Sequence, residues 1–430
     1  MKHEYDVIVF GGGTAGTVAA IQAGRIGAST LLVEKNGILG GTMTLGGINA
    51  PAHFFAWGKQ IIGGIGWELV RRTLEETGCP IPAPRPTQGP QDRQNMYAVT
   101  MDRGIYAALC DEAAIQAGVD LLFHAMPAAI AYQENGWTVT ICTKTGLRKL
   151  RAKVLIDATG DANAVHLAGF EVVHPDVVQP ATLQMYCSGY DPSTIDFDAL
   201  RVAEKQAIST GELKSTDVGW YDNGPATFLH NHGSNANHLQ APHAETSDGK
   251  TIAELEARKA VLRMHRFFRK QPGLENFRVD WICSEAGIRE TVTIKGKQTI
   301  SVQDYEAGKT YEDAVCNAFY PIDEHLNDGK GINYRDLKPN TLPTIPRGAL
   351  LPEGSRFLIV AGRCVSSDRE ANSGLRVACS CMAMGQAAGV MAALSAQSGV
   401  DPNALPLKDV LATLREQGAV VPEDDSTSAP

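Results

Sequence analysis

The sequence predicts an α/β fold in which a sheet-containing domain is interrupted along the chain by an inserted α+β domain. Glycine turns directly follow short apolar strands at three places, near residues 11, 160 and 362. From about His174 to Thr344 the apolar runs become shorter, and several histidines gather. We therefore expect residues 1–175 and 345–415 to form a discontinuous Rossmann-like domain. Residues 176–344 form the inserted domain, and 416–430 form a C-terminal tail.

The first of these turns has the pattern of a dinucleotide-binding loop. Residues 7–10 are β-branched or aromatic and predict a buried strand. The three glycines of a G-x-G-x-x-G motif follow, at Gly11, Gly13 and Gly16. The first permits a tight turn, the second lets backbone approach a pyrophosphate, and the third allows close helix packing. An alanine-rich helix then presents its N-terminus to phosphate.

A second strand, residues 30–33, ends in Glu34, 18 residues after Gly16. An acid at this place accepts hydrogen bonds from the adenosine ribose, and it would repel the 2′-phosphate of NADP. The loop alone does not choose between a nicotinamide and a flavin cofactor. The two further strand-to-glycine segments favour a flavin, because a nicotinamide domain does not need them.

The remaining elements follow from periodicity and from helix stop signals. Helices are expected at 67–77, 103–117 (ending before Gly118), 252–269 and 375–396 (ending before Gly399), and further strands at 119–123, 130–133, 137–143, 153–156 and 357–360. Asn135-Gly136 predicts a hairpin turn, residues 79–91 a proline-rich surface loop, and the final residues a disordered tail.

Composition narrows the class of protein. Of 430 residues, 43% are hydrophobic and 20% charged, and 39 basic against 48 acidic residues give a net charge of −9. This balance provides no basic surface for nucleic acid or an anionic membrane. Nine scattered cysteines and the absence of a signal-peptide pattern favour free thiols in the cytoplasm. Assembly into a homo-oligomer is left open.

The stretch 377–394 is apolar and long enough to span a membrane. It also contains Gly385, Gly389 and many alanines. A buried helix that packs closely through small residues is the favoured interpretation.

The chain resembles FAD-dependent oxidoreductases related to the fumarate reductase and succinate dehydrogenase flavoprotein group. The matching segments occur in family order from about Tyr5 to Leu394: VFGGGTAG, LGGTMT, GKQIIGGI, IDATGDA, GIRET, YPIDEH, IPRGALLP, VAGRCVS and MAMGQAAG. The resemblance implies a two-dinucleotide-binding-fold flavoprotein. It also implies FAD contacts at Gly11, Gly13, Thr14, Ala15, Gly16, Glu34, Lys35, Gly40, Gly41, Thr42, Ala158, Thr159, Gly160, Asp161, Gly362 and the amides of Arg376 and Val377.

Four side chains are candidates for catalysis. Arg289 would stabilise developing negative charge, unless it forms an ordinary surface pair with Glu290. His325 would move a proton, unless it is simply a packed or surface histidine. Arg363 would bind a substrate carboxylate or support the pyrophosphate side. His53 would line the pocket or carry a covalent flavin link.

A group of histidines in the inserted domain suggests a metal site at first sight. Its members are His230, His232, His238 and His243. Carboxylate or cysteine partners at a firm spacing are missing from the pattern, and loop histidines are often solvated. We therefore expect no metal.

The predicted activity is that of an enzyme: hydride transfer between a small polar substrate and flavin N5, with His325 handling the accompanying proton. Two alternatives stay open, an electron-passing or non-catalytic flavoprotein subunit and a nicotinamide-dependent dehydrogenase.

Overall fold

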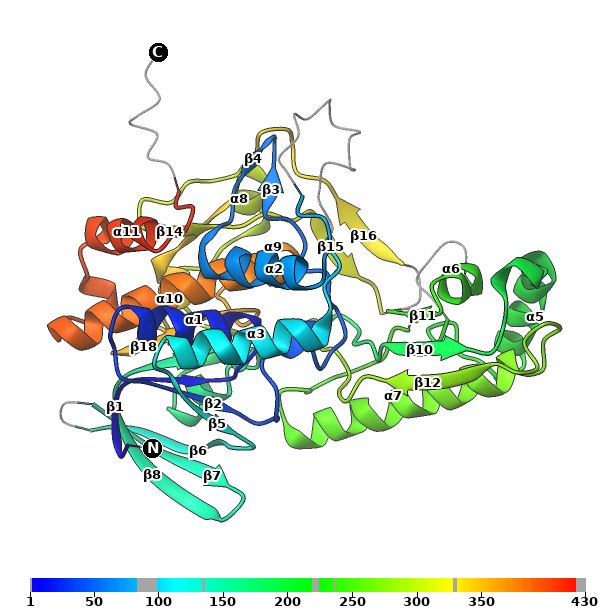
Figure 1. Cartoon of the computed structure of the whole chain (residues 1–430), viewed down its shortest axis with the longest axis horizontal. Coiled ribbons are helices and arrows are strands. Elements are labelled where there is room, and N and C mark those ends of the chain that lie inside the picture. Colours follow the sequence, from blue (N-terminus) through cyan, green and yellow to red (C-terminus); the bar gives the residue numbers. More distant parts are fainter. Residues whose placement is uncertain are drawn as a thin grey trace.

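The computed structural model describes residues 2–82, 99–133, 136–218, 224–235, 237–327 and 331–422. Most of the predicted proline-rich loop, the turn residue Asn135 and the tail from residue 423 lie outside these ranges. A sheet covered by helices and a smaller unit beside it make up the molecule (Figure 1). We call these the sheet domain and the inserted domain.

The sheet domain is built on seven strands with the order β5-β2-β1-β8-β7-β6, and β18 also pairs with β8. The strands β1, β2, β5, β8 and β18 are parallel, whereas β6 and β7 form an antiparallel hairpin against the first half of β8. Their bounds are β1 Glu4–Phe10, β2 Thr30–Glu34, β5 Asp120–Phe123, β6 Met126–Gln133, β7 Gly136–Thr143, β8 Gly146–Asp157 and β18 Leu358–Val360.

The strand register brings the three glycine turns to one edge of the sheet. Phe10, at the end of β1, pairs with Val33 on one side and Asp157 on the other. Asp157 in turn pairs with Val360 at the end of β18. Ligands of open parallel sheets bind outside the carboxyl ends of the strands. Segments more than 300 residues apart in sequence therefore meet at one site.

Helices cover one face of this sheet, as Figure 1 shows for α1, α3 and α10. A Cβ atom at Gly385 would lie 2.2 Å from Ala15 O, and one at Gly389 would lie 2.5 Å from Ala19 O, so α10 packs directly on α1. The most apolar window of α10 is 83% buried, which confirms the predicted buried helix. The helices are α1 Thr14–Arg25, α2 Gly64–Glu76, α3 Arg103–Gln116, α4 Asn163–Leu167, α9 Arg369–Leu375, α10 Ala378–Ser398 and α11 Leu407–Glu416.

One helix boundary differs from expectation. The prediction of a single helix over 375–396 is wrong at its start, because α9 ends at Leu375 and α10 begins at Ala378. Val377 lies between them in an extended conformation, with φ −66° and ψ 152°, and is the N-cap of α10. Because of this break, α10 has an N-terminus of its own and does not continue α9.

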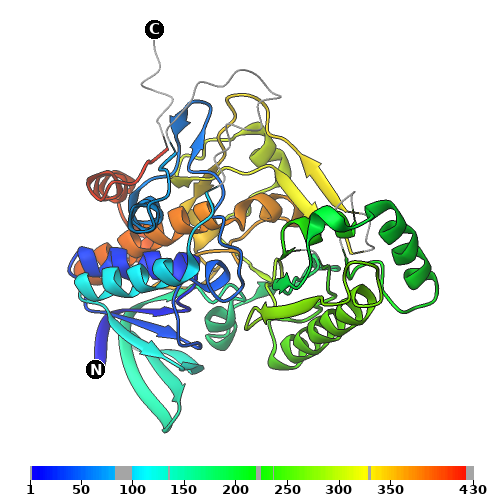
Figure 2. The same ribbon diagram turned by 45° about the vertical axis from the view of Figure 1, so that its right-hand side comes forward.

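The inserted domain has its own small sheet with the order β11-β10-β12, flanked by α7 (Figure 2). Buried aromatic side chains from α6, α7 and the segment before β12 form its core, among them Phe228, Phe268 and Phe277. The elements are β10 Met185–Ser188, β11 Gly233–Ser234, β12 Arg278–Ile282, α5 Phe197–Ser209, α6 Pro225–His230 and α7 Ser247–Phe268.

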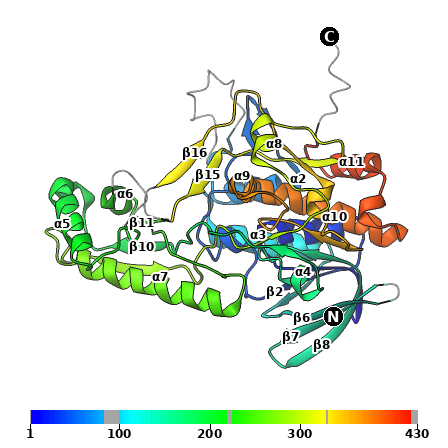
Figure 3. The ribbon, with the colours of Figure 1, turned by 180° about the vertical axis from the view of Figure 1, so that it is seen from behind.

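Residues 300–344 pack differently from the rest of the predicted inserted domain. Val315, Phe319 and Ile322 belong to the same hydrophobic core as α1 and α10, and Figure 3 shows α8 beside α9. The short elements here and at the domain junction are β3 Phe55–Ala56, β4 Lys59–Gln60, β9 Val172–Val173, β13 Thr293–Ile294, α8 Val302–Ala307, β14 Ala314–Asn317, β15 Ile322–His325, β16 Ile332–Arg335 and β17 Thr344–Pro346. The domain boundary at 344 stays a prediction.

Candidate active site

The G-x-G-x-x-G turn forms a backbone cradle at the carboxyl edge of the sheet. A Cβ atom at Gly11 would lie 2.5 Å from Ala158 O, and one at Gly16 would lie 1.8 Å from Gly11 O. Gly13 differs, because the atom nearest to a Cβ there, Gly41 Cα, is 4.0 Å away. Gly13 is also the N-cap of α1. Its open side leaves room for a phosphate group at the N-terminus of this helix.

Glu34 is held against this cradle by backbone amides. Its Oε2 accepts a hydrogen bond from Gly12 N at 2.6 Å, and its Oε1 accepts one from Asn36 N at 2.8 Å. Each carboxylate oxygen can accept more than one hydrogen bond, so ribose binding stays a prediction. The neighbouring Lys35 is half-exposed, and its Nζ pairs with Glu285 of the inserted domain at 2.5 Å.

The loop at residues 40–42 lies over the cradle. Gly40 and Gly41 have φ values of +95° and +55°, and a Cβ atom at Gly41 would lie 2.7 Å from Gly13 Cα. Gly40 N donates to Gly12 O at 2.9 Å, and Thr14 Oγ1 donates to Gly40 O at 3.4 Å. Thr42 is exposed. The predicted contacts at Thr14, Gly40, Gly41 and Thr42 are thus brought to the same place.

The second glycine segment is organised by the buried carboxyl of Asp157. Its Oδ1 accepts hydrogen bonds from Thr159 N at 3.0 Å and Thr159 Oγ1 at 2.7 Å, and its Oδ2 accepts one from Val165 N at 2.9 Å. Burial raises the pKa of Asp157. These bonds fix the turn that carries the predicted cofactor residues Ala158 to Asp161.

Arg363 joins the second and third glycine segments. Its guanidinium forms an ion pair with Asp161. The guanidinium also packs on Gly160, where a Cβ atom would lie only 2.6 Å from Arg363 Nη1. Gly362, with φ +103°, precedes it. The Nε of Arg363 is buried and has no hydrogen-bond partner among the described residues. This position beside predicted cofactor residues favours support of the pyrophosphate side over substrate binding.

The break between α9 and α10 brings a second arginine toward the inserted domain. The Arg376 amide donates to Asn372 O at 2.9 Å, so it is already used at the end of α9. Val377, the N-cap of α10, keeps the position predicted for a flavin contact. The Arg376 side chain donates to Gln179 Oε1 at 3.3 Å and to Asp323 O at 3.0 Å. Its Nε is buried and has no partner among the described residues.

His325 lies on β15 in direct contact with a second histidine. The distance from His325 Nδ1 to His238 Nε2 is 2.9 Å, and from His325 Nε2 to Asp323 Oδ2 it is 3.5 Å. The His325 amide also donates to Gln179 Oε1 at 3.2 Å. His325 and His238 are only 4% and 2% exposed. His325 is therefore not a surface histidine but one half of a buried imidazole pair.

Arg289 lies close enough to influence this pair electrostatically. Its Nη1 donates to Pro180 O at 2.7 Å and to Thr182 Oγ1 at 3.3 Å, and its Nη2 donates to Asn235 Oδ1 at 2.9 Å. Arg289 is 8% exposed and Glu290 5% exposed, so the alternative of an ordinary surface pair is wrong.

The electrostatics keep both imidazoles neutral at pH 7. Burial, and then the charge of Arg289, lower the pKa of His325 to about 3 and that of His238 to about 3. The pKa of Asp323 is lowered as well, because His325 and Arg376 together outweigh the effect of burial, so this carboxyl stays ionised. We call these side chains the His325 cluster: His238, Arg289, Asp323, His325 and Arg376. A neutral imidazole pair beside fixed positive charge can pass a proton and favours an anion nearby.

His53 lies in a more apolar place. Its ring stacks on Tyr320 with 5.4 Å between centroids, and Phe319 meets it edge-on at 6.2 Å. Burial lowers the pKa of His53 to about 4. His53 Nδ1 is buried and has no hydrogen-bond partner among the described residues. His53 is therefore a neutral ring that keeps one polar atom unused among aromatic side chains.

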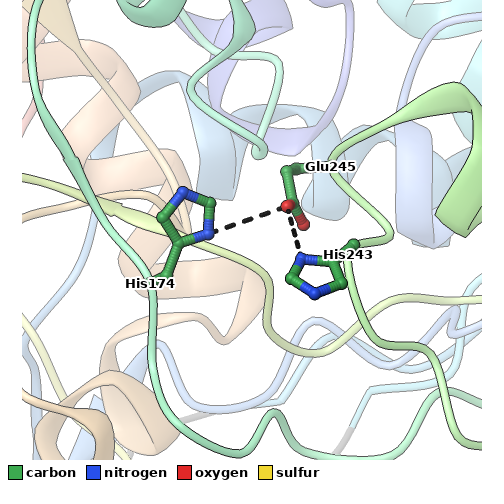
Figure 4. A group of neighbouring side chains, drawn as sticks. All are labelled: His174, His243 and Glu245. Carbon is green, nitrogen blue, oxygen red and sulfur yellow. Dashed lines mark hydrogen bonds and ion pairs between the residues drawn. The ribbon is translucent and has the colours of Figure 1, made fainter.

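The four histidines of the predicted group do not converge. His238 belongs to the His325 cluster, His230 packs on Phe197, and His232 stacks on Tyr190. His243 instead lies beside Glu245 and His174, as Figure 4 shows.

Sequence reasoning missed His238 as the partner of His325 and missed the Arg376 side chain. It also missed Gln179, which binds both the His325 amide and Arg376. These residues come from separate segments, and no local spacing relates them. Only the expectation that the inserted domain reaches the cofactor could have drawn attention to them.

A comparison with family models gives a match over nearly the whole chain. A family model described as FAD dependent oxidoreductase matches residues 6–414. A digeranylgeranylglycerophospholipid reductase from Methanoculleus marisnigri is 27% identical over 213 residues, which are 46% of this chain and 48% of that protein. The corresponding reductase 1 from Methanococcoides burtonii is 24% identical over 208 residues, 46% of this chain and 47% of that protein. The chain thus matches about half the length of these curated relatives.

Among the solved structures that match is a geranylgeranyl bacteriochlorophyll reductase-like protein from Thermoplasma acidophilum. It has a TM-score of 0.44 and 14% sequence identity, and the match covers 97% of this chain and 84% of that one.

Proposed function

Since this chain belongs to the FAD dependent oxidoreductase family, we propose that it transfers a hydride between a small polar substrate and N5 of bound FAD. A nicotinamide-only dehydrogenase is thereby set aside. When bound, FAD supplies a two-electron donor or acceptor, and the protein must position the substrate and handle the proton.

The chain's own backbone fits this cofactor. Gly13 has an open side at the N-terminus of α1, while Gly11 and Gly16 are closed by neighbouring backbone. Glu34 ends the neighbouring strand β2, which is the place where an acid contacts the adenosine ribose in this fold. The second and third glycine segments extend the same edge, where Asp161 and Arg363 form an ion pair. Val377, at the start of α10, would meet the flavin end.

One observation carries the proposal: His325 is linked through Asp323 to Arg376 directly before α10, and the charge of Arg289 acts on His325. Asp323 O accepts from Arg376, and Asp323 Oδ2 lies 3.5 Å from His325 Nε2. The proposed flavin end of the cofactor site and the only described imidazole–imidazole hydrogen bond therefore share Asp323. Proton transfer accompanies hydride transfer to or from a polar carbon, and it needs a side chain within hydrogen-bond reach.

In the proposed mechanism Arg289 attracts an anionic or developing negative group of the substrate. Its positive charge is among the causes that lower the pKa of His325 to about 3. An anion bound beside Arg289 offsets this charge and so raises the pKa of His325 against the larger effect of burial. His325 then takes the substrate proton at one ring nitrogen while His238 holds the other. The reverse sequence delivers a proton during reduction.

Within the family, we propose a relation to the fumarate reductase and succinate dehydrogenase flavoprotein group. The order of the motifs from VFGGGTAG to MAMGQAAG supports it. The curated relatives are named reductases, which favours testing reduction of a polarised alkene beside oxidation of hydroxy acids.

The test is anaerobic bleaching of the flavin absorbance by a panel of hydroxy acids, dicarboxylates, sugars and amines. We expect anionic substrates to bleach it, and Arg289→Met to lose the preference for anions over neutral analogues while FAD stays bound. Bleaching by neutral compounds alone, equally fast in Arg289→Met, would contradict the proposal. No bleaching by any compound, together with reduction through an added electron-transfer protein, would favour the electron-passing alternative.

A further inference from the structure

Away from the cofactor site, we propose that His174, His243 and Glu245 form a binding site for a zinc-class divalent metal. The three side chains point toward one another at the junction of the two domains (Figure 4). His174 follows β9 of the sheet domain, whereas His243 and Glu245 precede α7 of the inserted domain. A bound metal would join the two domains.

The distances fit a tetrahedral ion. Glu245 Oε1 lies 3.4 Å from His243 Nδ1 and 3.7 Å from His174 Nδ1, and all three ligand atoms lie within 4.8 Å of one another. Zinc binds nitrogen and oxygen at about 2.0–2.2 Å, so neighbouring ligand atoms of a tetrahedral site lie about 3.3–3.5 Å apart. The two distances from Glu245 Oε1 are thus close to those of a tetrahedral site. Small rotations of the exposed His174 and His243 rings would bring the two imidazole nitrogens to the same spacing.

The backbone around two of the ligands is fixed. Asn163 Nδ2, at the start of α4, donates to Glu245 O at 3.0 Å. His243 O accepts hydrogen bonds from Thr246 N at 2.9 Å and from Thr246 Oγ1 at 2.8 Å. His243 itself has a φ of +55°, a conformation that is costly for a residue with a side chain. The turn before α7 holds His243 and Glu245 side by side without relying on their mutual contact.

The donor set selects the class of metal. Two imidazoles and one carboxylate match the ligands of open zinc sites, which keep a further position for water. Magnesium and calcium prefer all-oxygen shells, so they fit poorly. The carboxylate of Glu245 supplies the negative charge of the site. Protons compete with a metal for the imidazole nitrogens, so binding should release protons and weaken in acid.

The pattern was hidden in the sequence because only His243 belongs to the predicted histidine group. Glu245 follows two residues later, but His174 is 69 positions away. The position of the site at the domain junction means that a bound metal would affect the stability of the whole protein. Ligands from both domains mean that binding favours the docked arrangement and raises the temperature of unfolding.

The test uses FAD-loaded protein that has been stripped with a chelator and then titrated with Co²⁺, followed by its visible absorbance, and with Zn²⁺ by calorimetry. We expect one ion per chain, a visible band typical of tetrahedral Co²⁺, and a higher melting temperature with Zn²⁺. Since even outer-shell partners are worth about 10–100-fold in affinity, His174→Ala and Glu245→Gln should each weaken binding at least tenfold.

His230→Ala is the matched control, because His230 is exposed and belongs to the same sequence group but packs on Phe197. It should bind metal like the unmodified chain. FAD content and melting temperature in chelator check that each variant is folded. Equal binding by His174→Ala, Glu245→Gln and the unmodified chain would overturn the proposal. So would no binding at all, or tighter binding of Mg²⁺ than of Zn²⁺.

Discussion

The glycine cradle and the His325 cluster are built by opposite means. The cradle consists of backbone, and its geometry depends on the absence of side chains at Gly11 and Gly16. The His325 cluster consists of side chains from four separate segments, held by hydrogen bonds to Gln179, Pro180 and Asp323. In the proposed function the cradle binds the cofactor, whereas the His325 cluster selects the substrate and handles the proton. Damage to one should therefore leave the other largely intact.

The largest expected effect that separates the two regions is on the rate of flavin reduction. His325→Asn keeps a polar group near His238 Nε2 but cannot hold a proton. Loss of a positioned acid or base typically costs ~10²–10⁴-fold. Stopped-flow reduction by the substrate found in the bleaching panel should slow by this factor, with FAD affinity unchanged. An unaltered rate would remove His325 from the mechanism.

Glu34→Gln should give the opposite pattern. The carboxylate accepts from Gly12 N and Asn36 N, and we expect it also to accept from the ribose. A hydrogen bond to a charged group contributes about 1.5–3 kcal/mol, or roughly 10-fold to 150-fold in affinity. Fluorescence titration of the stripped protein with FAD measures this. Weakened FAD binding at an unchanged reduction rate of the loaded enzyme supports the separation; unchanged affinity shows that Glu34 has only a structural role.

A pair of glycine variants tests the cradle itself. Gly16→Ala places a Cβ atom 1.8 Å from Gly11 O, and overpacking of this kind costs about 1–3 kcal/mol or more in folding stability. Gly13→Ala has 4.0 Å of space, so the stripped protein should keep its stability and lose only FAD affinity. Urea unfolding with and without FAD separates a loss of folding stability from a loss of FAD affinity. Equal destabilisation by both substitutions would mean that Gly13 has no open side.

The last predicted effect concerns acid stability. Burial lowers the pKa of His53 to about 4, whereas an unfolded histidine titrates near 6.5. Between pH 6.5 and pH 4 the unfolded chain binds a proton at His53 that the folded chain does not. The free energy of unfolding therefore decreases as the pH is lowered through this range. The slope is up to about 1.4 kcal/mol per pH unit for each such histidine. His53→Phe should reduce the slope between pH 6 and 4 by this amount.

The sequence predicted the parts of the molecule in which local pattern determines structure. Strands and helices around Gly11 appeared where expected, because apolar periodicity and glycine spacing act over a few residues. The packing of α10 on α1 also followed from small residues at Gly385 and Gly389. The break at Val377 was missed, since alanine-rich periodicity continues through it and the extended residue is stabilised by tertiary contacts.

The candidate site was predicted unevenly for the same reason. His325 and Arg289 were named from their motifs, yet nothing local indicated that His238 would be within 2.9 Å of His325. The ion pair between Asp161 and Arg363 joins residues 202 positions apart, and His174 and Glu245 of the proposed metal site are 71 positions apart. Such pairs arise only when the chain folds, so spacing rules cannot find them.

The most direct test of the account is a structure of the FAD-loaded protein, in which the distances from flavin N5 to His325 and Arg289 are measured. The account predicts that both side chains face the reactive side of the flavin, directly or through one water or substrate atom, since proton transfer needs hydrogen-bond reach. If both lie beyond about 10 Å with no such bridge, proton transfer through His325 is excluded on the same ground, and the His325 cluster serves only to hold the domains together.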